Sequence, residues 1–125
     1  MKRDIELERK ILLAIEEKYR AGEGSIFNVS VEDYSMPIIA EHCKLLYQQH
    51  LIEGYNDSFA DNKIYSFSVQ NLTAAGYDYL ELIRNDDIWE KTKKEVEEKK
   101  LPKTIEFLAK IAGIFTGNVI SEMNQ

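Results

Sequence analysis

Residues 51–70 read LIEGYNDSFADNKIYSFSVQ, and this stretch decides the fold. Turn-forming pairs at 56–57 and 61–62 bracket a loop, and Phe59 lies in that loop, where an aromatic side chain is unexpected. In the return strand, three apolar residues alternate with polar ones and are expected on one face: Tyr65, Phe67 and Val69. The stretch therefore predicts a two-stranded β-hairpin.

The residues after the hairpin, LTAAGYDYLELIRNDDIW at 72–89, predict a helix. Thr73 is a good N-cap, and Leu72 and Tyr77 are spaced to form a hydrophobic staple around it. Gly76 lies in the first turn, where a glycine costs about 1 kcal/mol relative to alanine. We therefore expect another backbone, that of the first helix, to approach Gly76 closely; simple tolerance of the glycine is the alternative.

Before the hairpin, the sequence predicts a helix from Ser35 to about His50. Ser35 is a favourable N-cap, and Pro37 suits the first turn of a helix. The buried stripe of this helix is expected to contain Ile39, Cys43 and Leu46. The opposite face then presents Pro37, Glu41, Lys44 and Gln48.

Further helices are predicted towards both ends of the chain. Asp4 caps the first helix, whose apolar stripe contains Leu7, Ile11 and Ile15. The segment SIFNVSV at 25–31 predicts a short strand. The highly charged residues 88–100 predict a helix on the surface, and the more apolar residues from about 103 to 123 predict the last helix.

The order helix, strand, helix, two-stranded hairpin, helix resembles that of a winged-helix domain. HCKLLYQQHLIEG at 42–54 is similar to the end of the recognition helix and the next strand in bacterial winged-helix regulators, and LTAAGYDYLE at 72–81 resembles the Leu-Thr-x-x-Gly stretch after their wing. Most of the chain, beginning with MKRDIELERKILLAIEE, is similar to a family of small bacterial and prophage proteins catalogued as domain of unknown function 2513. The resemblance implies a winged-helix fold and no established activity.

Two positions depart from the winged-helix pattern. His50 stands where many winged helices have glycine, so it must adopt the left-handed turn itself or reshape it. The scaffold helix that normally precedes the recognition helix has little room, because only residues 31–34 separate the short strand from Ser35. A shortened scaffold helix puts normal docking in a DNA groove in doubt.

We therefore predict an α+β protein with two parts. Residues 1–86 form a winged helix-turn-helix domain (helix, short strand, helix, two-stranded wing, helix). Residues 87–125 form a C-terminal helical extension that serves in packing or in dimerisation.

Double-stranded DNA is one candidate partner of this fold. The candidate DNA-contacting residues are Ser35, Glu41, Lys44 and Gln48 on the second helix and Asn62 and Lys63 on the wing. Two lysines are few for a face that also carries three carboxylates, Glu41, Asp57 and Asp61, although basic residues in the first helix can add charge: Lys2, Arg3, Arg9 and Lys10. The first hypothesis is thus a transcriptional regulator of bacterial or phage genes, and the alternative is a protein–protein interaction module that binds no nucleic acid.

The composition limits the remaining possibilities. The formal net charge is -6, which disfavours nonspecific attraction to phosphates but permits a local basic patch. The single cysteine, Cys43, rules out an intrachain disulfide, and nothing indicates an oxidising compartment. The N-terminal residues lack the apolar region of a signal peptide, and charged and polar residues interrupt the apolar stretch 104–120. We expect a cytoplasmic protein without a membrane span.

Chemistry-bearing residues are sparse. His42 and Cys43 are adjacent on a helix and point in different directions, so we expect Cys43 in the core and His42 at its edge. One cysteine and two histidines are too few for a zinc site, and no glycine-rich phosphate loop is present. We expect no enzymatic activity, metal or cofactor.

The last helix carries a stripe of small residues that permits close helix packing: Ala109, Ala112, Gly113 and Gly117. This stripe can pack on the chain's own domain. The alternative, which we favour, is a symmetric homodimer through the last helix, since this helix is more apolar than one buried face requires.

Overall fold

The structure is a computed structural model of the chain; it describes residues 1–123 and, within them, the side chains of residues 1–117. The chain divides into two compact units, Met1–Tyr77 and Asp78–Gln125. This division falls inside a helix, and the domain boundary expected at residue 86 stays a prediction.

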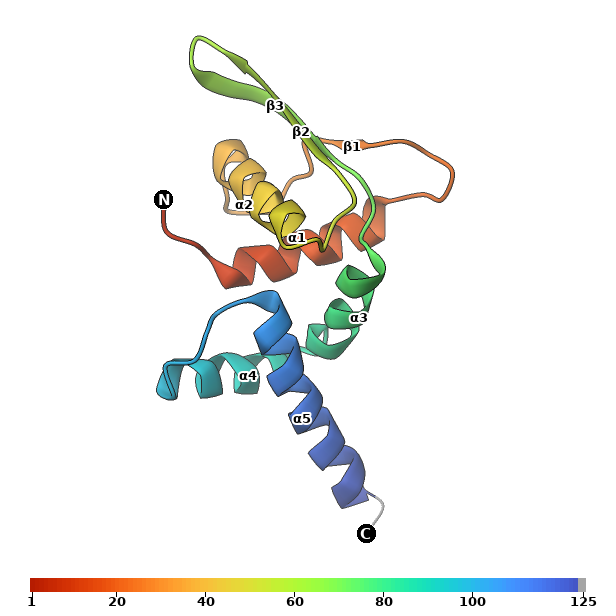
Figure 1. Cartoon of the computed structure of the whole chain (residues 1–125), viewed down its shortest axis with the longest axis vertical. Helices are drawn as coiled ribbons and strands as arrows, with labels where there is room; N and C mark the ends of the chain where they lie inside the picture. The colour runs from red at the N-terminus through yellow and green to blue at the C-terminus, as the bar shows by residue number, and fades with distance from the viewer. Residues whose placement is uncertain (124–125) are drawn as a thin grey trace. The chain divides into compact units, whose positions relative to one another are not determined.

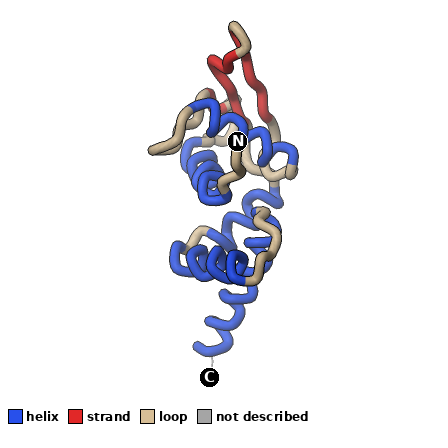
Figure 2. The backbone as a smooth tube through the Cα atoms, turned by 90° about the vertical axis from the view of Figure 1, so that its left-hand side faces the viewer, coloured by secondary structure: helices blue, strands red, loops and turns tan. Residues whose placement is uncertain are grey.

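The first unit holds two helices, a small sheet and the start of a third helix (Figure 1). Its elements, in chain order, are α1 (Ile5–Lys18), β1 (Ile26–Phe27), α2 (Met36–Gln48), β2 (Tyr55–Ala60), β3 (Lys63–Val69) and the beginning of α3 (Ala74–Ile83). The hairpin of β2 and β3 projects beyond α1 and α2 (Figures 1 and 2). The predicted α+β class is confirmed, and the arrangement is winged-helix-like.

The sheet is antiparallel, with strand order β1-β3-β2. A two-residue turn closes the hairpin, and Asp61 and Asn62 both adopt positive φ, at 54° and 64°. Two successive positive φ values are typical of a type I′ turn, which matches the twist of the flanking strands, and Asp and Asn tolerate it. The longer predicted loop is therefore wrong: Phe59 lies within β2.

A shift of register in the hairpin changes which side chains share a face. Ser58 pairs with Ser66, but Phe59 pairs with Ile64, so Tyr65 has no partner on β2. Phe67 and Val69 are buried as predicted, whereas Tyr65 is 60% exposed. Tyr65 is therefore outside the core that Phe67 and Val69 join, at the point where the register shifts; that the three share one face stays a prediction.

The core of the first unit joins both helices to the sheet. Asp4 caps α1 as predicted, with its Oδ1 accepting the Leu7 N–H at 3.2 Å. The buried apolar residues come from α1, α2, β3 and the segments that connect the elements: Leu7, Ile11, Leu12, Ile15, Val29, Ile39, Cys43, Leu46, Leu51, Ile52, Phe67, Val69 and Leu72. The predicted stripes of α1 and α2 are confirmed, including Cys43 in the core.

The start of α3 explains the glycine in its first turn. The hydroxyl of Thr73 accepts the Gly76 N–H at 3.0 Å, so Thr73 is the N-cap. A Cβ at Gly76 would overlap the carbonyl oxygen of Leu51, which also accepts the Thr73 N–H at 3.0 Å. Close approach of a backbone is confirmed, but the expected partner is wrong: it is the segment after α2, not the first helix.

Both departures from the winged-helix pattern are visible in the backbone. His50 adopts φ 62°, and the bonds Leu51 N–H to Leu46 O, 3.0 Å, and His50 N–H to Tyr47 O, 2.9 Å, complete a Schellman motif at the end of α2. Between β1 and α2, residues 28–35 form no helix. A turn, closed by the Tyr34 N–H on the Val31 carbonyl at 3.2 Å, stands in place of a scaffold helix.

The second unit contains the end of α3, α4 (Asp86–Glu98) and α5 (Ile105–Met123). The side chain of Asn85 caps α4 by accepting the Ile88 N–H at 2.9 Å. One face of α4 is buried, as predicted for a surface helix, and α5 contributes four buried residues: Ile105, Leu108, Ala109 and Ala112. No helix in the described part of the chain is long and apolar enough to cross a membrane.

Candidate functional site

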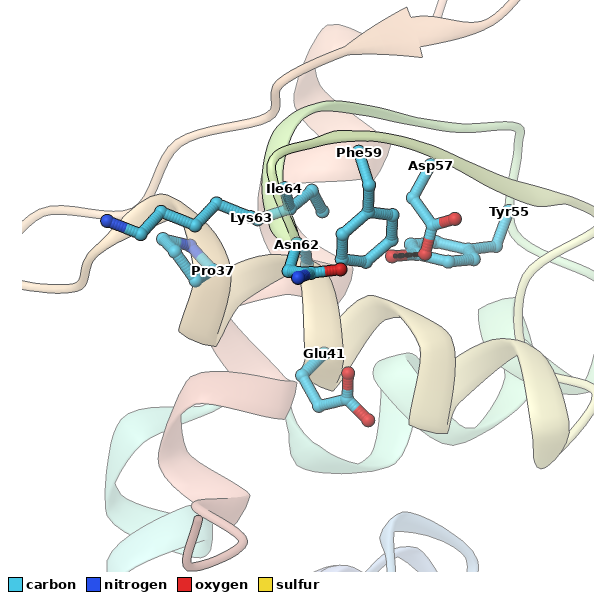
Figure 3. A pocket seen from close by; sticks show the side chains of 9 residues that line it. Pro37, Glu41, Tyr55, Asp57, Phe59, Asn62, Lys63 and Ile64 are labelled. Atoms are coloured by element: carbon cyan, nitrogen blue, oxygen red, sulfur yellow. Dashed lines mark hydrogen bonds between the residues drawn. The ribbon is translucent and has the colours of Figure 1, made fainter.

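A groove of about 400 Å³ lies between α2 and the hairpin (Figure 3). Its walls come from the two elements that were predicted to contact DNA, the second helix and the wing. The lining residues are Pro37, Ala40 and Glu41 on α2 and Tyr55, Asp57, Phe59, Asn62, Lys63 and Ile64 on the hairpin. We refer to it as the α2–hairpin groove.

The pleat of β2 directs alternate side chains into this groove. Tyr55, Asp57 and Phe59 lie two residues apart along β2 and so share a face. Figure 3 shows these three side chains together on the side of β2 that faces α2. Because of the register shift, Ile64 pairs with Phe59 and joins this face.

Tyr55 and Asp57 form a fixed pair in the groove. The Tyr55 hydroxyl donates to Asp57 Oδ2 at 2.8 Å, and the Tyr55 ring stacks on that of Phe67 with centroids 6.4 Å apart. Burial, followed by this hydrogen bond and the nearby negative charges of Asp57 and Glu41, raises the pKa of the Tyr55 hydroxyl. A carboxylate has capacity for several hydrogen bonds, so Asp57 is oriented by Tyr55 and still able to accept from a ligand.

The net charge of the groove is negative. Glu41 and Asp57 supply two carboxylates, and the Glu41 carboxylate has no hydrogen bond or ion pair with another described residue. Lys63 supplies the one ammonium among the lining residues. In Figure 3 the Lys63 side chain extends past Pro37, away from Asp57 and Tyr55.

The structure gathers half of the predicted DNA-contacting residues in this groove. Glu41, Asn62 and Lys63 line it. Lys44 and Gln48 are exposed on α2 but do not line it, and Ser35 is an exposed residue at the N-cap of α2 whose hydroxyl makes no cap hydrogen bond.

The two arginines near the N-terminus, Arg3 and Arg9, lie beside acidic side chains. Arg3 donates through Nε and Nη2 to the fully buried Glu8 carboxylate at 2.7 and 2.9 Å. Arg9 is 5% exposed and lies 3.9 Å from Glu6. Lys10 lies 6.0 Å from the centre of the Tyr34 ring. Arg3 and Arg9 therefore add little positive charge to the face that was predicted to meet DNA.

A polar network anchors the start of α1 to α2. His42 is fully buried; its Nε2 accepts the Asp4 N–H at 2.9 Å, and its Nδ1 lies 2.8 Å from the Ile38 carbonyl. These bonds assign the neutral Nδ1–H tautomer. The Tyr34 hydroxyl donates to Asp4 Oδ2 at 2.8 Å; burial and this bond raise the pKa of Tyr34 to about 12. His42 is thus a structural residue, more buried than the edge position expected.

The residues predicted for dimerisation divide into two groups. Ala109 and Ala112 are fully buried in the second unit. A side chain at Gly113 would meet Leu82 at 3.7 Å, whereas nothing lies within 4 Å of a Cβ placed at Gly117. Most of the stripe therefore already serves the chain's own packing, and the homodimer stays a prediction.

Sequence reasoning missed the aromatic and acidic wall of the groove. Tyr55 was not considered, Asp57 was counted only as a charge, and Phe59 was placed in a loop. The period-two spacing of Tyr55, Asp57 and Phe59 was a usable signal. It was hidden because Asn56-Asp57 is also a turn-forming pair.

Fold and groove together define a small winged-helix-like α+β protein with an acidic, aromatic groove beside its second helix. The chain belongs to the family described as Hypothetical protein (DUF2513), which matches residues 2–102. It is similar to a protein of Haemophilus influenzae named Uncharacterized protein, with 30% identity over 123 residues that span 98% of each chain. The comparison with solved structures gave no match.

Proposed function

We propose that this protein is a protein–protein interaction module that uses the winged-helix-like arrangement without binding nucleic acid. The observation that carries the proposal is the charge of the α2–hairpin groove, whose lining holds two carboxylates, Glu41 and Asp57, and one lysine, Lys63. A surface that meets phosphates needs positive potential, and a carboxylate at the contact opposes it.

Exposed aromatic side chains on the sheet support the same proposal. Phe27 is 69% exposed, and Phe59 and Tyr65 are each 60% exposed. Protein interfaces are enriched in aromatic residues and depleted of lysine, as this sheet surface is. These rings lie on one small sheet, and each offers apolar area that a protein partner would bury.

A photo-crosslinking amino acid placed at Phe59 in the producing cell tests this function. The expected result is a discrete protein adduct that depends on the crosslinker at Phe59 and is missing when the crosslinker stands at Glu23, an exposed residue of the same unit. An adduct with nucleic acid from Phe59, or the same protein adducts from both positions, would contradict the proposal.

The second candidate function is a DNA-binding regulator of bacterial or phage transcription. Lys44 and Gln48 favour it, since both are exposed on α2 and their side chains can contact base edges. Fluorescence anisotropy with a random duplex at low salt separates the two functions. A DNA-binding protein gives saturable, salt-sensitive binding that Lys44→Glu weakens. An interaction module gives no binding to the duplex, either as the wild type or as Lys44→Glu.

Self-association and location complete the proposal. A homodimer through α5 is compatible with the module, and Gly117 is the position of the small-residue stripe that is open to a second helix. We also propose that the module acts in the cytoplasm and has no catalytic role of its own.

A further inference from the structure

We infer that the α2–hairpin groove binds an arginine side chain presented by a partner protein. The inference rests on the proposed function and specifies its partner by chemistry. Three features of the groove carry it: its size, its charge and the rings beside its carboxylates.

The groove has the size for one long side chain. Its volume is about 400 Å³. Ligand sites in proteins commonly span about 300–1,000 Å³, so this groove is at the small end of that range. A single side chain with its flanking backbone suits this space better than a whole helix does.

The charges of the groove are complementary to a cation. Glu41 on α2 and Asp57 on β2 both line the groove, so each of its two walls contributes a carboxylate that can attract a cation. Tyr55 holds Asp57 by its hydrogen bond of 2.8 Å, which restricts the carboxylate before any ligand arrives. A preformed acceptor of this kind loses less entropy on binding than a free one.

The rings beside these carboxylates favour arginine over lysine. Tyr55 and Phe59 both line the groove, and Phe59 is 60% exposed. A guanidinium stacks its plane on an aromatic face while its edge donates to carboxylates in a fork. An ammonium is a compact, strongly hydrated charge that cannot do both as well.

Replacing Lys63 should change the affinity for arginine in the opposite direction to replacing a carboxylate. Its ammonium is at the rim of the groove and repels an incoming cation. Removing it should therefore tighten binding, whereas removing a carboxylate should weaken it.

The experiment selects ligands from a random peptide library on the full chain and measures their affinities by anisotropy. We expect the selected peptides to share an arginine. Its replacement by citrulline, which has nearly the same shape without the charge, should raise Kd about tenfold, the effect of one charge-assisted hydrogen bond. Glu41→Gln and Asp57→Asn should each weaken binding by a similar factor, and Lys63→Ala should strengthen it about twofold to threefold.

Matched variants control for folding and for overall charge. Asp61→Asn and Glu53→Gln remove the same charges from exposed positions outside the groove lining and should leave Kd unchanged. Asp57→Asn keeps an acceptor for the Tyr55 hydroxyl, so the hairpin should remain folded.

Three outcomes would overturn the inference. In the first, the selected peptides carry no cation, and Phe59→Ser abolishes their binding. The proposed interaction function then stands, but the inference that the groove binds arginine is wrong. In the second, selected peptides are insensitive to every groove variant. In the third, no peptide is selected, while crosslinking from Phe59 separately decides whether the proposed function survives.

Discussion

Gly76 determines how closely the chain after the hairpin returns to the end of α2. The carbonyl of Leu51 occupies the space that a Cβ at this position would need. That carbonyl also accepts the Thr73 N–H, so it cannot withdraw without breaking the bond that starts α3. A glycine that looks unfavourable for the helix is therefore required by the packing of two backbones.

Replacing this glycine should destabilise the first unit strongly. For Gly76→Ala we expect the free energy of unfolding to fall by at least about 2 kcal/mol, because backbone must move to relieve the overlap. Gly24→Ala is the matched control, since no atom lies within 4 Å of its added Cβ, and it should change stability by less than about 0.5 kcal/mol. Urea denaturation measures both; equal effects would show that the overlap is not the cause.

Cys43 should be unreactive in the folded protein. It is fully buried, and burial raises the pKa of its thiol from 9.0 to about 12. Because the folded state favours the neutral thiol, stability is fully present below pH 9 and is lost as the pH rises towards 12. Labelling with a thiol reagent at pH 8 should therefore be slow in buffer and fast in denaturant, and fast labelling of the folded chain would refute the assigned burial.

Individual residues show where the sequence was sufficient and where it was not. Thr73 as a cap and Cys43 as a core residue follow from local pattern alone, and both predictions are confirmed. The partner of Gly76 and the exposure of Tyr65 depend on how distant segments meet. A sequence shows that a glycine needs space; which backbone takes that space is decided only by the tertiary fold.

At the scale of elements, α2 ends in an unfavourable residue. His50 adopts φ 62°, a left-handed conformation that costs a non-glycine residue about 1–2 kcal/mol. The surrounding hydrogen bonds of the Schellman motif keep it there. A left-handed residue within the same hydrogen-bond pattern also ends α4: Lys100 adopts φ 53°, and the Leu101 N–H donates to the Val96 carbonyl at 3.0 Å.

Glycine at this position should stabilise the protein. His50→Gly removes the strain but adds entropy to the unfolded chain, so we expect a net gain of about 0.5–1 kcal/mol in the free energy of unfolding. Gln48→Gly, two residues earlier at the last residue of the helix, should instead cost up to about 1 kcal/mol. If His50→Gly is as harmful as Gln48→Gly, the left-handed conformation at residue 50 is incorrect.

The helices of this protein were more predictable than its hairpin. The apolar stripes of α1 and α2 repeat over several turns, so their existence was clear from the sequence. The hairpin depends on single residues: a two-residue turn at Asp61-Asn62 and a bulge at Tyr65. Because the groove wall is built on this hairpin, the candidate site was the least predictable part of the structure.

At the scale of the whole molecule, the homodimer predicted from the small-residue stripe of α5 can be tested directly. Gly113→Leu is a poor test, because a larger side chain there would press on Leu82 of the same chain. Gly117→Leu is cleaner, since the space around Gly117 is open. If two copies pack through this stripe, the wild type should sediment as a dimer at micromolar concentration.

Gly117→Leu should then raise the dissociation constant of the dimer about tenfold or more, because two helix backbones cannot approach across a leucine. Its unfolding transition should stay close to that of the wild-type protomer, which separates loss of association from loss of fold. Ile114→Glu provides a second variant, since Ile114 is 59% exposed and a charge there opposes burial against another chain. A wild-type chain that remains monomeric would instead show that the stripe, with Ala109 and Ala112 already buried at its start, exists to pack α5 on its own unit.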